Sequence, residues 1–153
     1  MMKKINVIIL DSRIGKTIPI PKYETKGSAG LDLRSSFKKE VILLPNKTIL
    51  SPTGIAIYIK ESLITAIILP RSGLGHKNGL VLGNSIGLLD SDYQGELKIS
   101  LWNRSKKSFS ITPGMRIAQL VFLPIIKVKF KIISKFNNIT ERGNKGFGHT
   151  GEK

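Results

Sequence analysis

Residues 64–74 read ITAIILPRSGL, and this stretch sets the expectation for the fold. A short, largely β-branched apolar run is followed at once by Pro70 and Gly73, which end it. The pattern is typical of a buried strand that stops at a polar turn. We therefore expect a strand over 64–69 and a loop with polar side chains directly after it.

Similar short segments recur on both sides of this one. Glycine or proline interrupts the chain about every ten residues, and no amphipathic helical pattern lasts eleven. The strands that we predict cover residues 4–10, 41–44, 55–59, 64–69, 96–102, 116–123 and 126–132. In the last of these, apolar residues alternate with three lysines, so we expect one buried and one solvated face near a sheet edge. So many short strands predict an all-β, jelly-roll-like distorted barrel, because closure removes open edges.

Length and composition favour one folded domain. The chain has 153 residues, of which 41% are hydrophobic and 23% charged, as in ordinary globular proteins. It has no cysteine, which excludes disulfide scaffolds and a cysteine nucleophile and suits a reducing compartment. The apolar run at 5–10 is too short for a signal peptide, and no run reaches the roughly 18 residues of a membrane span. We therefore expect a soluble, cytoplasmic protein without membrane contact.

The formal net charge of +15 raises the question of a polyanionic partner. Of the 25 basic residues 19 are lysines spread along the whole chain, so charge alone is a weak sign of nucleic-acid binding. Arginine is scarce and concentrated in or beside segments that carry glycine or aspartate: Arg34, Arg71, Arg104, Arg116 and Arg142. We interpret these arginines as reserved for fixed anion contacts, and we expect no specific nucleic-acid partner.

Three polar, glycine-bearing segments interrupt the predicted strands. The first, GSAGLDL at 27–33, brings Asp32 into an apolar-flanked turn, where small residues allow close approach of a ligand or another chain. A simple bend capped by Asp32 explains it equally well. The second, PRSGL at 70–74, offers a guanidinium, a hydroxyl and backbone amides for a phosphate, although an ordinary turn is as good an account and the Walker spacing is absent.

The third segment, GLLDSDYQGE at 87–96, gathers three of the ten acidic residues. Asp90 and Asp92 would face the same side of an extended strand, as a metal-linked pair or a base with a neighbour. For Asp92 and Glu96 we prefer a hairpin turn with solvated carboxylates. Asp90 follows two leucines, so we expect it to be partly buried, which suits a tuned general base.

The C-terminal residues have a different character. Residues 142–151 hold four glycines and almost no apolar side chain, so this stretch cannot bury enough surface to order itself alone. We predict a β-barrel domain over 1–136 and a flexible, glycine-rich arm over 137–153. His76 and His149 are far apart and have no metal-ligand spacing, and no GxSxG elbow for serine hydrolase chemistry occurs.

Five of these segments together resemble a known family. AGLDL, PRSGLG, GLLDSDYQGE, RIAQLVF and RGNKGFGHTG occur in this order between Ala29 and Gly151, and the set is similar to the five motifs of the trimeric dUTPases. The resemblance implies a jelly-roll-like subunit and a homotrimer with three active sites, each built from all three chains. It also implies Mg²⁺-assisted hydrolysis of dUTP to dUMP and pyrophosphate, which keeps uracil out of DNA and supplies dUMP for dTMP synthesis.

The resemblance also assigns roles to single residues. Asp90 is similar to the general base that activates water for attack on the α-phosphorus, and Tyr93 to the residue that packs on deoxyribose and disfavours a 2′-hydroxyl. The hairpin that reads uracil corresponds to 84–89, with Asn84, Leu88 and Leu89. The residues that match phosphate contacts or border the substrate are Arg71, Ser72, Gly73, Gln119 and Lys98.

The arm and the metal receive roles in the same way. Arg142 resembles a phosphate clamp, and Phe147, with Gly148 beside it, resembles the ring that lies over uracil. The triphosphate would carry most of the Mg²⁺ coordination, with Asp32 holding its hydration shell through water. Two positions depart from the family pattern: Lys145 replaces a usual glycine, and His149 replaces a more frequent serine.

Two alternatives stay open at this point. The dCTP deaminase branch shares the fold and parts of the second and third motifs, but DSDY and the arm with Phe147 resemble the hydrolase. A non-enzymatic basic β-barrel that binds nucleic acid is supported only by charge, and it lacks the clustered aromatics that such modules use for stacking.

Overall fold

The computed structural model describes residues 2–138 and 140–146. Its strands are short and antiparallel, and its one helical element is a single π-turn among these residues. The elements in chain order are β1 (Asn6–Ile9), β2 (Leu31–Arg34), β3 (Val41–Leu43), β4 (Thr48–Tyr58), β5 (Ile64–Leu69), η1 (Leu74–Asn78), β6 (Leu80–Leu82), β7 (Gly87–Leu89), β8 (Glu96–Asn103), β9 (Phe109–Ile111) and β10 (Arg116–Pro124).

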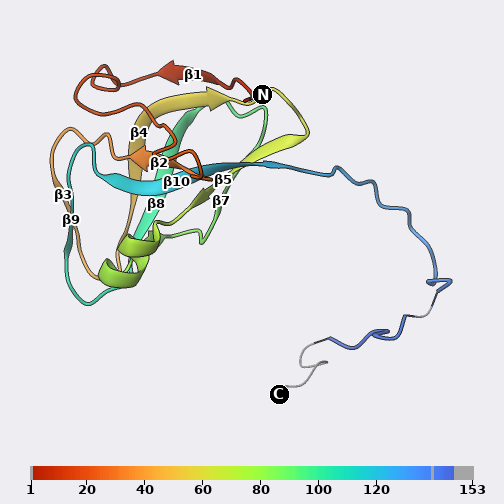
Figure 1. The fold of residues 1–153 in the computed structure, drawn as a ribbon. Helices are drawn as coiled ribbons and strands as arrows, with labels where there is room; N and C mark the ends of the chain where they lie inside the picture. The colour runs from red at the N-terminus through yellow and green to blue at the C-terminus, as the bar shows by residue number, and fades with distance from the viewer. Residues whose placement is uncertain (1, 139, 147–153) are drawn as a thin grey trace.

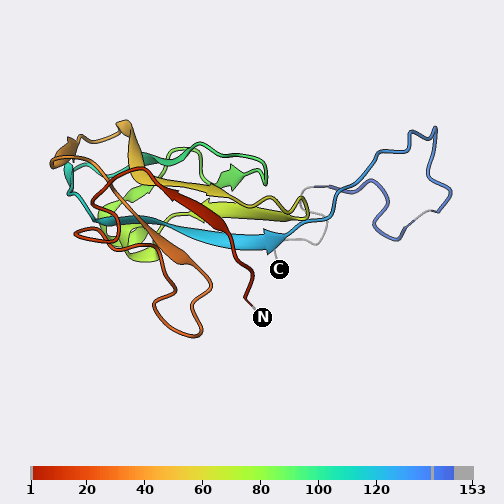
Figure 2. The same ribbon diagram turned by 90° about the horizontal axis from the view of Figure 1, so that it is seen from above.

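Two four-stranded sheets form the body of the barrel (Figure 1). One has the strand order β1-β4-β8-β6 and the other β2-β10-β5-β7. β3 and β9 form a separate two-stranded antiparallel sheet. In Figure 1, β1 and β4 of the first sheet lie above β10 and β5 of the second, and in Figure 2, seen from above, β1 crosses in front of β10. This arrangement confirms the predicted all-β, jelly-roll-like class.

The core lies between the sheets and follows from strand alternation. In β8, Leu97, Ile99 and Leu101 are buried, while the side chains between them point outward. Isoleucine and leucine from β4, β5 and β10 complete the same cluster. Burial of this apolar surface is the main force that holds the two sheets together.

The strand predictions were largely confirmed, with one clear error. Residues 64–69 form β5 as predicted, and the strands predicted at 41–44, 96–102 and 116–123 agree with β3, β8 and β10 to within one residue at each end. The predicted strand at 126–132 is wrong, because these residues form no strand and both of its faces are exposed. Ile126, Phe130 and Ile132 are each about nine-tenths exposed or more. Alternation makes this segment suitable for a sheet, but no strand among residues 2–138 and 140–146 pairs with it.

The loop after β1 is fixed by a half-buried ion pair. Asp11 is buried and accepts a hydrogen bond from Arg13 Nη2 at 2.6 Å, while Lys38 Nζ lies 3.0 Å away. The hydrogen bond from the Arg13 side chain holds the pKa of the Asp11 carboxyl well below its usual range. Asp11 also packs against Gly54, where it leaves no room for a side chain, since a Cβ on residue 54 would lie 2.7 Å from Asp11 Cβ. Gly54 also has a φ of +71°, in the left-handed region that favours glycine. A bend in β4 at Gly54 therefore depends on glycine.

The chain after β10 leaves the barrel. Figures 1 and 2 both show the described part of this segment running away from the sheets. No helix in the described residues is long and apolar enough to cross a membrane.

Candidate functional site

Six of the predicted site residues line one cavity of about 370 Å³. We call it the hairpin cavity, because its wall is the turn between β6 and β7 and the loop between β7 and β8. The six residues are Asn84, Leu88, Leu89, Asp90, Tyr93 and Lys98. The floor is apolar, with Ile68, Leu82 and Ile99 below the polar rim. The cavity can therefore take a flat, partly apolar group whose polar edge faces backbone and Asn84.

The position of Asp90 follows from β7. This strand pairs with β5, with Leu89 opposite Ala66, so Leu89 points into the core and Leu88 points outward. Asp90 comes directly after the strand and is exposed on the cavity rim, so the prediction that it is partly buried was wrong for the single chain. Only one of the two leucines before it, Leu89, has a buried side chain, because successive residues of a strand point to opposite faces.

The Asp90–Asp92 pair does not form as an extended strand would place it. Ser91 and Asp92 form a turn, closed by a hydrogen bond of 3.2 Å from Tyr93 N to Asp90 O. Asp92 is exposed there, as predicted, and does not line the hairpin cavity. Of the two carboxylates, only that of Asp90 therefore lines the hairpin cavity.

Tyr93 and Glu96 fix the loop that follows. The Tyr93 hydroxyl donates to Glu96 O at 3.0 Å, and the ring lies where a side chain on Gly95 would be, so only glycine fits beside it. Glu96 was predicted as a solvated turn residue, and this was wrong. It begins β8, is half-buried, and its Oε1 accepts the Gly54 N–H at 3.0 Å. This contact joins the cavity to the bend in β4.

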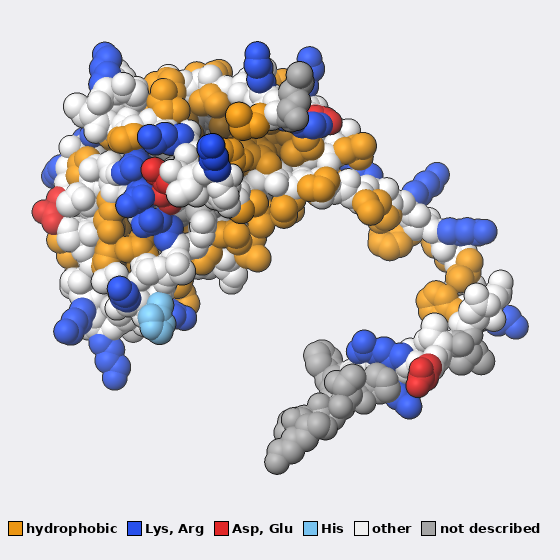
Figure 3. All heavy atoms as spheres, in the orientation of Figure 1, with side chains coloured by type: hydrophobic (Ala, Val, Ile, Leu, Met, Phe, Trp, Pro, Cys, Tyr) orange, Lys and Arg blue, Asp and Glu red, His pale blue; other side chains and the backbone are white. Residues whose placement is uncertain are grey.

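The predicted phosphate residues line a second cavity, of about 530 Å³. We call it the arginine cavity. Arg71, Ser72 and Gly73 reach it from the segment after β5, Gln119 from β10 and Asp32 from β2. Gln119 Nε2 donates to Pro70 O at 3.0 Å, which ties β10 to that segment. In Figure 3, basic side chains gather around acidic ones over β2 and β10, where this cavity lies.

Asp32 holds two arginines in this cavity. Arg71 Nε lies 2.8 Å from Asp32 Oδ1, and Arg116 Nη1 lies 3.2 Å from Asp32 Oδ2. Asp32 is largely buried, with 15% of its side chain exposed, so these pairs are shielded from solvent more than surface ion pairs. Arg116 lines the cavity too. It was one of the five arginines interpreted as reserved for fixed anion contacts, but the family resemblance assigned it no specific role. Two signals in the sequence pointed to Arg116: arginine is scarce among the basic residues, and Arg116 begins the segment RIAQLVF.

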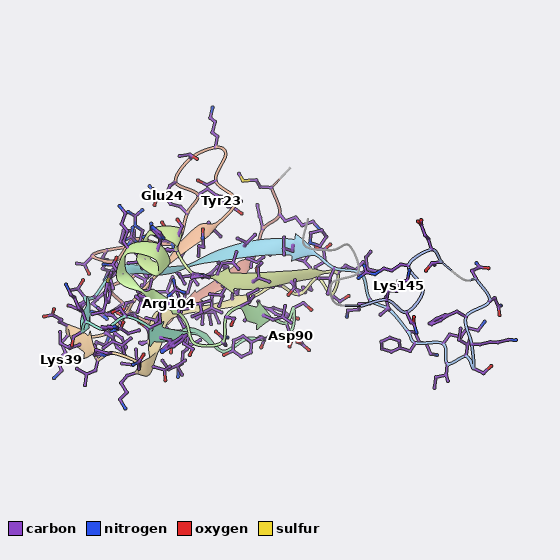
Figure 4. All side chains as sticks on the ribbon, turned by 90° about the horizontal axis from the view of Figure 1, so that it is seen from below. Tyr23, Glu24, Lys39, Asp90, Arg104 and Lys145 are labelled. Atoms are coloured by element: carbon purple, nitrogen blue, oxygen red, sulfur yellow. The ribbon has the colours of Figure 1, made fainter. Side chains whose placement is uncertain are left out.

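The two cavities lie on opposite sides of one sheet. Ile68 lines the hairpin cavity and its neighbour Leu69 lines the arginine cavity, and adjacent strand residues point to opposite faces. Figure 4 shows Asp90, from the first cavity, and Glu24, from the second, on opposite sides of β5 and β10. The cavities share no lining residue. Within one chain, Asp90 and Arg71 therefore line two separate cavities.

The arm residues are only partly described. Arg142 is exposed, and its Nε donates to Lys145 O at 3.1 Å within the same segment. Phe147, Gly148 and His149 lie outside the described residues. In the part that is described, Arg142 is not among the residues that line either cavity.

The residues present fit a magnesium ion that arrives with a phosphate ligand. Among the described residues, no three His, Cys, Asp or Glu side chains converge on one point. Mg²⁺ usually keeps several waters and is bound through one or two carboxylates together with substrate phosphates, rather than by an all-protein cage. Asp32, in the arginine cavity, is a carboxylate that such an ion could contact through water.

The chain matches one family over most of its length. The family model described as dUTPase matches residues 16–151. The deoxyuridine 5'-triphosphate nucleotidohydrolase of Buchnera aphidicola subsp. Baizongia pistaciae is 60% identical over 152 residues, which cover 99% of this chain and 100% of that protein. The protein with the same description from Serratia proteamaculans is 58% identical over 151 residues, 99% of each chain.

Solved structures of dUTPases are similar to this chain as well. A variant of the Staphylococcus bacteriophage 80alpha dUTPase, solved with dUpNHpp, has a TM-score of 0.84 and 28% identity and covers 98% of this chain and 99% of its own. A dUTPase of the Staphylococcus aureus phage phi11, solved to show the coordination of a structural Mg(II) ion, has a TM-score of 0.76 at 24% identity. It covers 89% of this chain and 100% of its own, and at that identity it supports the fold.

Proposed function

The chain belongs to the dUTPase family and hydrolyses dUTP to dUMP and pyrophosphate, and we propose that it does so at sites shared between three copies. One copy would supply the hairpin cavity with Asp90 and another would supply the arginine cavity with Arg71. The observation that carries this proposal is the separation of the two cavities on opposite sides of one sheet. The cytoplasm is the compartment that we propose, in keeping with the cysteine-free sequence.

Asp90 is the general base of the proposed mechanism. Its carboxylate takes a proton from a water molecule, whose oxygen attacks the α-phosphorus. The bond from that phosphorus to the bridging oxygen breaks, and pyrophosphate leaves. The exposed position of Asp90 on the cavity rim supports this role, because a base must reach a water beside the substrate.

The remaining residues bind and position the substrate. Uracil enters the hairpin cavity against Asn84, Leu88 and Leu89, and deoxyribose packs on the Tyr93 ring, with Lys98 at the border. The phosphates meet Arg71, Ser72, Gly73 and Gln119 of a neighbouring copy. Arg142, Phe147 and Gly148 of the arm complete the site. Phosphoryl transfer depends mainly on such positioning and charge stabilisation.

Magnesium enters this scheme with the substrate. When bound to the triphosphate, Mg²⁺ neutralises phosphate charge and lowers the cost of bringing the anion into the site. The protein would contribute at most a water-mediated contact from Asp32, which is supported by the position of Asp32 in the arginine cavity.

Apolar surface that the single chain leaves uncovered also supports a homotrimer. The side chains of Ile126, Val128, Phe130 and Ile132 are 74% to 97% exposed, and those of Ile8 and Ile9 on β1 are 62% and 43% exposed. Large apolar side chains exposed in such numbers indicate an interface. A closed, symmetric assembly of identical chains is the simplest way to cover it.

A mixing experiment tests whether the sites are shared. Asp90→Asn and Arg71→Ala homotrimers should each be nearly inactive. When the two chains are unfolded and refolded together, random assortment gives about a quarter of the sites both wild-type residues, since Asp90 and Arg71 come from different copies. We expect activity to reappear in that proportion, measured as pyrophosphate release.

The same samples supply the controls. Light scattering should give a mass of three times 16.9 kDa for each variant and for the mixture. If the mixture stays as inactive as its two components, Asp90 and Arg71 act within one copy and the shared site is wrong. A fully active monomer would lead to the same conclusion.

A substrate panel tests the role of Tyr93. The wild-type enzyme should release pyrophosphate from dUTP far faster than from UTP, dTTP or dCTP, and it should release no ammonia from dCTP. Tyr93→Ala should reduce the preference for dUTP over UTP by about tenfold or more, because a contact that excludes a hydroxyl or methyl group discriminates by roughly 10 to 200-fold. Relative kcat/KM values measure this. An unchanged dUTP/UTP ratio in Tyr93→Ala would remove Tyr93 from the sugar site.

A further inference from the structure

Arg116 is an arginine of the arginine cavity to which the family resemblance assigns no specific role. It begins β10 and lines the same space as Arg71, Ser72 and Gly73. We propose that Arg116 is a second phosphate-binding arginine of this site and that Asp32 is the positioning residue that fixes both guanidinium groups. The proposal rests on the proposed function of the cavity as the phosphate site.

A β-bulge aims Arg116 into the cavity. Along the β2–β10 ladder, Arg116 lies opposite Arg34 and Ala118 lies opposite Leu33, so Ile117 is an extra residue on β10. Ile117 and Ala118 are consecutive and both buried, which regular alternation would not allow. The bulge resets the alternation, and Arg116 comes to share a face with Gln119 although the two are three residues apart. Re-aiming a side chain at a site is a common role of bulges.

Asp32 is placed to hold both arginines at once. It lies on β2, next to β10, and β10 lies next to β5, whose end leads to Arg71. Each carboxylate oxygen pairs with one arginine, at 2.8 Å for Arg71 and 3.2 Å for Arg116. A carboxylate shared in this way limits the rotamers of two long side chains that would otherwise move freely in an open cavity.

Both arginines keep hydrogen-bond donors for a ligand. In residues 2–138 and 140–146, Arg71 uses only Nε and Arg116 only Nη1 in hydrogen bonds, and both bonds go to Asp32. A guanidinium has five N–H donors in a fixed fork, so each arginine retains several. The side chains are 30% and 42% exposed, which leaves those donors accessible. Two such forks suit the oxygens of a polyphosphate.

The test measures binding of two ligands that differ in phosphate content. A nonhydrolysable imido analogue of dUTP and dUMP are titrated by calorimetry into wild-type enzyme, Arg116→Ala, Arg71→Ala and Arg34→Ala. Loss of a charged hydrogen-bond donor should weaken the triphosphate analogue about tenfold or more in Arg116→Ala and leave dUMP within about twofold. A general structural defect would weaken both ligands.

Arg34→Ala is the matched control. Arg34 pairs with Arg116 in the ladder and carries the same charge, but it donates to Gly114 O and does not line the cavity. Its loss should leave the affinity for the analogue within about twofold of wild type, because a guanidinium strengthens phosphate binding mainly when it hydrogen-bonds the phosphate directly. If Arg116→Ala folds poorly, Arg116→Lys tests the same point, since it keeps the charge but not the fork.

Asp32→Asn distinguishes three roles of Asp32: positioning of the two arginines, a purely electrostatic effect, and a contact to the Mg²⁺ hydration shell. Pure electrostatics predicts tighter triphosphate binding once a negative charge is removed, whereas a positioning role predicts weaker binding. A role through the Mg²⁺ hydration shell predicts a loss only when Mg²⁺ is present. We expect weaker binding of the analogue both with Mg²⁺ and in EDTA.

The outcomes are distinguishable. Equal binding by Arg116→Ala and wild type, with a loss in Arg71→Ala, overturns this inference and leaves the proposed site intact. Tighter binding in Asp32→Asn, or a loss confined to Mg²⁺, overturns the positioning role. If neither Arg71→Ala nor Arg116→Ala weakens the analogue, the cavity does not bind phosphate and the proposed site itself fails.

Discussion

Asp90→Asn should lower kcat for dUTP by about 10² or more while leaving the fold, the assembly and analogue binding unchanged, because general-base catalysis is typically worth 10² to 10⁴ in rate. The substitution costs no structural contact: in the described residues the Asp90 side chain makes no hydrogen bond or ion pair, and only its backbone oxygen is used, by Tyr93 N. Asparagine keeps the shape and removes the basic oxygen. Steady-state kinetics, calorimetry with the imido analogue and the thermal midpoint measure the three quantities.

Asp92→Asn is the matched control for this experiment. Asp92 lies two residues away, is exposed in the same turn and does not line the hairpin cavity. It should keep kcat within about threefold of wild type, as surface substitutions away from a site usually do. An Asp90→Asn enzyme that keeps more than a third of wild-type kcat, or an equal loss in Asp92→Asn, would mean that Asp90 is not the base.

The local sequence pattern was sufficient to predict the strands that bury one or both of their faces. β5 could be predicted because it is a short, largely β-branched apolar run that Pro70 ends. β8 could be predicted because it follows Gly95 and buries every second residue. β7, with only Gly87–Leu89, could not, because three residues carry no periodicity and the strand exists through its pairing with β5. Residues 126–132 show the reverse case, since their alternation is strong but the part of the chain that the structure describes contains no partner strand for them.

The site shows the same division between local and distant information. The residues around each cavity were predicted because their motifs occur in a known order, and the resemblance assigns their roles. The Asp32–Arg116 pair joins residues 84 positions apart, and the Glu96–Gly54 contact joins residues 42 apart. Pairings at such separations depend on sheet order and register, which a single sequence does not reveal. For this reason the sequence indicated an anion contact for Arg116 without its partner Asp32, and it placed Glu96 in a solvated turn.

The described part of the arm, residues 140–146, makes no hydrogen bond to the barrel among the described residues. Hydrogen bonds described for residues 140–146 stay within that segment: Gly143 N to Thr140 O, Lys145 N to Arg142 O, and Arg142 Nε to Lys145 O. Residues 142–151 contain four glycines, so ordering them is costly in conformational entropy. Arg142 has a natural partner in the phosphates of the substrate, and the resemblance gives Phe147 a place over uracil.

Deletion of residues 142–153 should therefore leave the thermal midpoint and the trimer mass nearly unchanged but lower kcat/KM for dUTP by about 10². The reason is that nucleotide binding, rather than the barrel, would provide the energy that orders the arm, and closure would exclude water and add the Arg142 contact to the phosphates. Phe147→Ala should lose part of the same factor through the stacking contact, although Phe147 lies outside the described residues. Kinetics of the truncated enzyme and amide exchange with and without the imido analogue measure the effect. A truncated enzyme within threefold of full activity, or equal protection of the arm in both states, would show that the arm plays no part in binding or catalysis.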